Sequence, residues 1–129
     1  MTGWDPAALE LIALLPRTGR GPKRDGIYAL WLTLRVAQDI VLDPPLPERM
    51  QRKRLAALEA RFSSLTLPGP LRRALGACLQ HLKDAPAETV PQLLSHLVAP
   101  ARESAGAEAA YALSRAARAV KQRLGKAAT

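Results

Sequence analysis

The chain has 129 residues, of which 48% are apolar, and a formal net charge of +8. This length and apolar content predict one domain over residues 1–129 and exclude an intrinsically disordered chain. The single cysteine excludes an internal disulfide, no apolar run reaches the ~20 residues that span a bilayer, and no signal-peptide pattern is present, so we expect a cytoplasmic protein.

The N-terminal segment predicts a helix over residues 6–15. Asp5 is placed to cap this helix, and Pro6 follows at the first helical position, where its missing N–H would have no partner in any case. Trp4 and Leu9 have the spacing of a hydrophobic staple around that cap.

A loop over residues 17–26 follows Pro16 and contains four basic residues and three glycines. It leads into the N-terminus of the next predicted helix, where free backbone N–H groups favour anions. Together with Arg20, Lys23 and Arg24, these groups would hold a phosphate, although the stretch lacks the P-loop pattern. The alternative is a solvated connector between two helices.

Residues 24–42 form the predicted central helix. At 100° per residue its apolar side chains cover almost the whole circumference, and only Arg35 and Asp39 mark a clear polar strip. A helix that is apolar nearly all round is a buried helix. We therefore expect the other helices to pack around it, with Tyr28 and Trp31 contributing to the core.

After a proline-rich break, a helix over residues 47–62 carries a thin apolar stripe and a basic face. Arg49, Arg52 and Lys53 share that face by their i, i+3, i+4 spacing. These cations repel one another at the positive end of the helix, which is locally unfavourable and suggests a use such as phosphate contacts. The alternative is a solvated face that is partly neutralised by Glu48, Glu59 or another helix.

Two further helices are expected over residues 70–83 and 90–99. Cys78 and His81 are one turn apart in the first, but zinc needs three or four ligands, and only His96 and scattered carboxylates remain. We therefore expect Cys78 to be a core residue and predict no metal or cofactor. The acidic residues form no clustered pair for general acid–base catalysis, so the sequence does not predict an enzyme.

The last helix is expected over residues 104–124, with Gly125 as its stop signal and residues 126–129 as a frayed tail. Small and apolar residues repeat along it with heptad spacing. This seam would pack against the chain's own helices, which is the simpler arrangement, or against the same helix of a second copy. Its members are Gly106, Ala110, Leu113, Ala117, Val120 and Leu124.

The apolar residues are mainly Ala and Leu, which favour helices over strands. We therefore predict an all-α, single-domain bundle of five to six helices around the central helix. The lack of site chemistry and the small-residue seam predict a non-catalytic protein-interaction module that binds a protein partner or forms a homo-oligomer through its last helix.

The net charge supports an alternative function, because a basic surface attracts polyanions. The alternative is a nucleic-acid backbone-binding accessory protein with little sequence specificity. Its candidate phosphate contacts are the two basic clusters described above, namely Arg20, Lys23, Arg24, Arg49, Arg52 and Lys53.

Overall fold

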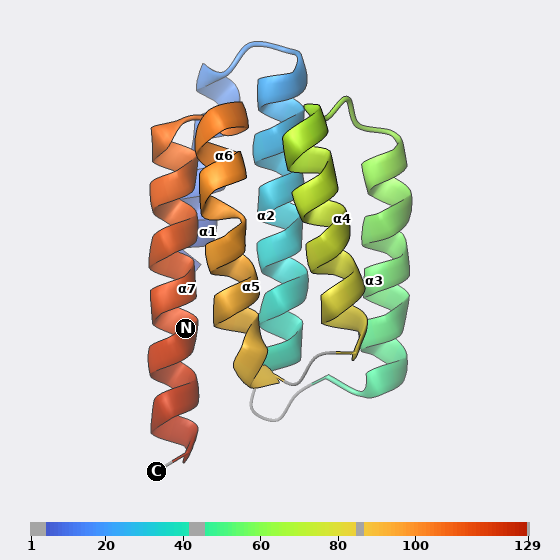
Figure 1. The fold of residues 1–129 in the computed structure, drawn as a ribbon, viewed down its shortest axis with the longest axis vertical. Coiled ribbons are helices and arrows are strands. Elements are labelled where there is room, and N and C mark those ends of the chain that lie inside the picture. The colour runs from blue at the N-terminus through green and yellow to red at the C-terminus, as the bar shows by residue number, and fades with distance from the viewer. Residues whose placement is uncertain (1–4, 42–45, 85–86, 129) are drawn as a thin grey trace.

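The computed structural model describes residues 5–41, 46–84 and 87–128. Within these ranges the chain is helical and contains no strand, which confirms the all-α prediction. The α-helices are α1 (Asp5–Leu14), α2 (Pro22–Val41), α3 (Glu48–Ser63), α4 (Gly69–Asp84), α5 (Val90–His96), α6 (Val98–Ala105) and α7 (Ala107–Ala128). Short 3₁₀ turns, Leu15–Arg17 and Ala87–Thr89, follow α1 and precede α5. Because α5 and α6 stack end to end, the described bundle consists of six rods (Figure 1).

The second helix is the centre of the bundle, as predicted. Each of the other α-helices in the described part of the chain contacts α2. Ile27, Leu30 and Leu34 on α2 are almost completely inaccessible to solvent. Rods that follow one another along the chain run in opposite directions, so α2, α4 and α7 start at the end of the bundle where α1, α3 and α6 finish (Figure 1). No described helix is both long and apolar enough to cross a membrane.

One face of α2 is only partly covered: Trp31 packs against the core as predicted, whereas Tyr28 is not part of the core cluster. Tyr28 and Trp31 are only partly buried, and Arg35 is exposed. The reason lies in their spacing, because Tyr28, Trp31, Arg35 and Asp39 follow one another at three- or four-residue intervals along a single stripe. Aromatic rings tolerate this half-exposed position, since a guanidinium group can cover the ring face.

The loop before α2 is shorter than the predicted range 17–26. The helix begins at Pro22, which places Lys23 and Arg24 in its first turn. Proline is favoured at the first helical position, because its φ is already helical and its missing N–H needs no partner there. Two predictions for the start of α1, the cap from Asp5 and the hydrophobic staple from Trp4, depend on side chains that the structure does not describe.

The helices after residue 90 also begin and end differently from the prediction. The helix expected over residues 90–99 divides at Leu97, and Pro100 lies in the first turn of α6, where proline is tolerated. Gly106 is not part of the last helix, because its φ of 101° ends α6 and turns the chain into α7. Gly125 does not end α7, which continues to Ala128, since one glycine costs a helix only about 1 kcal/mol.

Two glycines should respond in opposite directions to replacement by alanine. Gly76→Ala should raise the free energy of unfolding by about 1 kcal/mol, because Gly76 is helical and exposed and a methyl group there meets no atom within 4 Å. Gly106→Ala should lower it by about 1–3 kcal/mol, because its φ of 101° is strained for any residue with a Cβ. Urea denaturation measures both changes. A neutral Gly106→Ala variant would contradict the backbone requirement at the α6–α7 junction.

Candidate functional site between α2 and α3

The six basic residues predicted as phosphate contacts do not share one surface. All six are exposed, but they lie at the starts of two antiparallel helices (Figure 1). One cluster precedes and begins α2, whereas the other begins α3. Because α2 has 20 residues and is therefore about 30 Å long, the two clusters occupy opposite ends of the bundle.

The cluster at the start of α3 is partly neutralised, as the solvated-face alternative expected. Arg52 lies 3.8 Å from Glu48, one turn earlier in the helix. Both side chains are more than two-thirds exposed, so this ion pair contributes little to stability. Arg49 and Lys53 form no ion pair with another described residue.

The predicted helix-pairing seam lies in the chain's own core. Four of its members are buried on α7, which packs against α5, α6 and α1; they are Ala110, Leu113, Ala117 and Val120. Leu124 is partly buried, and Gly106 lies outside the helix. This burial agrees with the intramolecular packing that was the simpler expectation for the seam, whereas self-association through the last helix stays a prediction.

The nucleophile and metal-ligand candidates are dispersed. Cys78 is buried on α4, and burial raises the pKa of its thiol from 9.0 to about 12. His81 is exposed, with its Nδ1 atom 2.7 Å from the carbonyl oxygen of Ala77. No three His, Cys, Asp or Glu side chains are grouped for a metal ion in the part of the chain that the structure describes. The Cys78 thiol therefore belongs to the core.

An open groove of about 420 Å³ separates α2 from α3. Its floor is apolar and consists of Leu32, Val36, Ala57 and Leu58. Tyr28 and Asp39 lie near the two ends of its α2 wall, and three arginines edge it: Arg35 from α2, and Arg54 and Arg61 from α3. Three cations against one carboxylate give the groove a formal charge of +2.

Two of these arginines are held over aromatic rings. The rings of Tyr28 and Trp31 stack with their centroids 6.0 Å apart and their planes 22° from parallel. The Arg35 Cζ atom lies 5.7 Å from the Trp31 ring centroid, and the Arg61 Cζ atom lies 5.6 Å from that of Tyr28. Arg61 also donates a hydrogen bond of 2.9 Å to the Tyr28 hydroxyl. These contacts restrict the guanidinium groups before any ligand arrives.

The third arginine fixes α3 against α2. Arg54 Nη1 donates a 2.8 Å hydrogen bond to Asp39 Oδ2. The Asp39 side chain is only 12% exposed, whereas that of Arg54 is 47% exposed. This ion pair neutralises the acidic residue in the groove and leaves the other guanidinium N–H groups of Arg54 at its edge.

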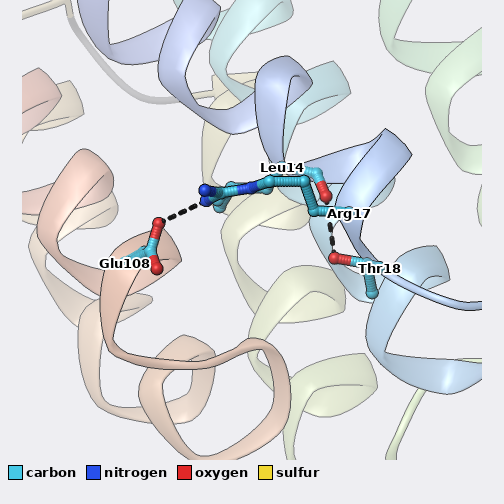
Figure 2. A network of polar contacts seen from close by, with 4 residues as sticks. All are labelled: Leu14, Arg17, Thr18 and Glu108. Atoms are coloured by element: carbon cyan, nitrogen blue, oxygen red, sulfur yellow. Dashed lines mark hydrogen bonds and ion pairs between the residues drawn. The ribbon is translucent and has the colours of Figure 1, made fainter.

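The hollow between α1 and α7 has a different electrostatic character, because its charges are paired. Arg17 donates a 2.8 Å hydrogen bond to Glu108, and the hydroxyl of Thr18 donates to the Leu14 carbonyl oxygen, which ends the turn after α1 (Figure 2). Arg115 is paired with Glu10 across the same two helices. These contacts connect α1 and the turn after it to α7. They leave little net charge in the hollow for a ligand.

The groove between α2 and α3 is therefore the candidate site, and sequence reasoning did not find it. Arg35 was recognised only as part of a polar strip, and Arg61 was not singled out. The intervals between Tyr28, Arg35 and Asp39 were the available signal. These intervals could not reveal that Arg54 and Arg61 of α3 lie opposite this side of α2, next to Asp39 and Tyr28.

No family model, curated protein or solved structure matches this chain. No relative therefore supplies a ligand or a reaction for the groove, and its function has to be inferred from its own side chains.

The buried thiol should be nearly inert in the folded protein. Because the pKa of Cys78 is raised to about 12, the reactive thiolate is almost absent at about pH 8. We expect an aromatic disulfide reagent to label Cys78 slowly in native protein and rapidly in guanidinium chloride. Equal labelling rates in native and denatured protein would contradict a buried thiol.

The raised pKa of Cys78 also implies that the free energy of unfolding falls as the pH rises from 9.0 towards 12, because the thiol of the unfolded chain loses its proton first.

The ion pair between Arg54 and Asp39 should be worth more than the exposed pair beside it. Arg54→Met should lower the free energy of unfolding by about 1–3 kcal/mol, because it leaves the nearly buried Asp39 carboxylate without its partner. The matched control is Arg52→Met, which breaks the exposed pair with Glu48 and should change stability by less than about 1 kcal/mol. Urea denaturation of both variants makes the comparison, and equal effects would contradict it.

Proposed function

We propose that this protein is a non-catalytic interaction module that binds an acidic segment of a partner protein in the groove between α2 and α3. The observation that carries the proposal is the combination of an apolar floor with three arginines at its edges. An apolar floor binds apolar side chains by removing them from water, and guanidinium groups bind carboxylates. A peptide with both kinds of side chain is complementary to this groove.

The same groove is less suited to nucleic acid. A phosphate backbone gains nothing from the apolar floor, and the two predicted basic clusters lie too far apart to follow one short strand. Bases would stack on exposed aromatic rings. Here Tyr28 and Trp31 stack on each other, and Arg61 and Arg35 already lie over their faces. These features favour a protein partner over the nucleic-acid alternative.

A peptide-display selection tests this function. The α2 wall from Tyr28 to Asp39 is about 16 Å long, so displayed random peptides of about 12 residues can span it as a helix. We expect selection on the wild-type protein to enrich peptides that combine acidic and apolar residues. Replacing Arg35 and Arg61 together by Glu should weaken their binding by about tenfold or more.

The control variant carries the same change of charge elsewhere. Arg102 and Arg118 are exposed on α6 and α7, outside the groove, and replacing both by Glu should leave peptide binding unchanged. Equal losses in the two double variants would mean that net charge alone attracts the peptides. A labelled single-stranded or duplex oligonucleotide that binds more tightly than any selected peptide at physiological salt would favour the nucleic-acid alternative instead.

A further inference from the structure

The partner segment bound by the groove can be specified further, on the premise of the proposed function. We infer that it is an amphipathic helix with two carboxylates seven residues apart and apolar side chains midway between them. The inference depends on what the groove offers to a backbone, on the spacing of its arginines and on the position of Ala57.

The groove cannot satisfy the backbone of an extended peptide. Its walls are two helices, whose own backbone N–H and C=O groups are bonded within α2 and α3 away from their ends. The lining side chains provide donors on three arginines, but their acceptors are confined to the Tyr28 hydroxyl and the Asp39 carboxylate, which already accept hydrogen bonds. An extended segment would therefore find no free acceptor for those of its N–H groups that face the groove rather than water. A helix satisfies its own backbone and presents only side chains.

The arginine spacing matches two turns of such a helix. Arg54 and Arg61 are seven residues apart on α3, which corresponds to about 10 Å along the axis. A partner helix lying along α3 returns to the same face after seven residues. Carboxylates at positions i and i+7 of the partner would therefore reach both arginines.

Both arginines retain donors for such carboxylates. A guanidinium group has five N–H donors, and Arg54 and Arg61 each donate one hydrogen bond to another described side chain. Arg35, on the opposite wall, forms no hydrogen bond or ion pair with another described residue and lies over Trp31. Arg35 adds positive charge to the α2 wall of the groove, at a position along the helix between Tyr28 and Asp39.

Ala57 determines where the partner's apolar side chains fit. It lies between Arg54 and Arg61 on α3, is exposed, and lines the groove beside Leu58 with a single methyl group, which takes up little of the groove's space. Leu32 forms the facing part of the floor and is partly exposed. Apolar residues at positions i+3 and i+4 of the partner would occupy this space, since those positions lie on the same face as i and i+7. The expected pattern is Glu-x-x-Leu-Leu-x-x-Glu.

Fluorescence anisotropy with two labelled synthetic peptides tests the inference on the full-length protein. The first is an alanine-rich helix that carries this pattern, and the second has the same composition with both glutamates moved to the opposite helix face. We expect the first peptide to bind about tenfold or more tightly than the second, because only its carboxylates and leucines face the groove together.

Two variants separate this fit from simple charge attraction. Ala57→Arg fills the floor while adding a positive charge, and we expect it to weaken binding of the first peptide by about tenfold or more. Arg61→Glu removes one carboxylate contact and should also weaken it, whereas Arg102→Glu, an equal charge change on the exposed surface of α6, should not. Circular dichroism confirms that each variant remains folded.

The outcomes distinguish this inference from the proposed function. Equal affinity for the two peptides, or tighter binding of both by the Ala57→Arg variant, would overturn the helical pattern. If peptides selected by display bind through Arg35 and Arg61 while the patterned peptide does not, the pattern is wrong and the proposed function stands. If neither the displayed nor the synthetic peptides depend on these arginines, both fail.

Discussion

The apolar side chains of α2 are removed from water by six helices of the same chain that pack around them. Complete burial of a leucine or isoleucine side chain contributes about 1.5–3 kcal/mol, so Ile27, Leu30 and Leu34 together contribute an amount comparable to the net stability of a small domain. The directions of the other helices follow from this requirement. Each of them turns an apolar stripe towards α2 or towards a helix that already covers it.

The candidate site exists because this covering is incomplete. In the described chain α3 packs mainly against α2 and α4 and lies at the edge of the bundle (Figure 1). Its buried side chains are Leu55, Leu58 and Phe62, a stripe too narrow to cover the whole facing side of α2. The uncovered strip is closed at its ends by Tyr28 with Arg61 and by Asp39 with Arg54. The same arrangement that supports the core therefore leaves an apolar floor between charged edges.

The parts of this structure that depend on local sequence were predicted well. Apolar periodicity and the positions of Pro and Gly predict the helix type and the central position of α2. They also predict the first and last residues of α3 and α4 to within one residue of those observed. The groove was not predicted, because it depends on Arg61 meeting Tyr28 across 33 positions of sequence. Basic clusters were chosen by local charge density, which carries no information about the direction in which neighbouring helices run.

The contacts between α1 and α7 affect how the chain reaches this structure. Arg17 and Glu108 are 91 positions apart, and Glu10 and Arg115 are 105 apart. Such distant pairs raise the contact order, which is the mean sequence separation of residues in contact. Most other contacts in the bundle join rods that follow one another along the chain. Because the long loop between α1 and α7 must close before these pairs form, folding is slower. During synthesis the apolar side of α1 that packs against α7 therefore stays accessible until α7 has been made. This interval, rather than the native state, is when the chain is most exposed to aggregation.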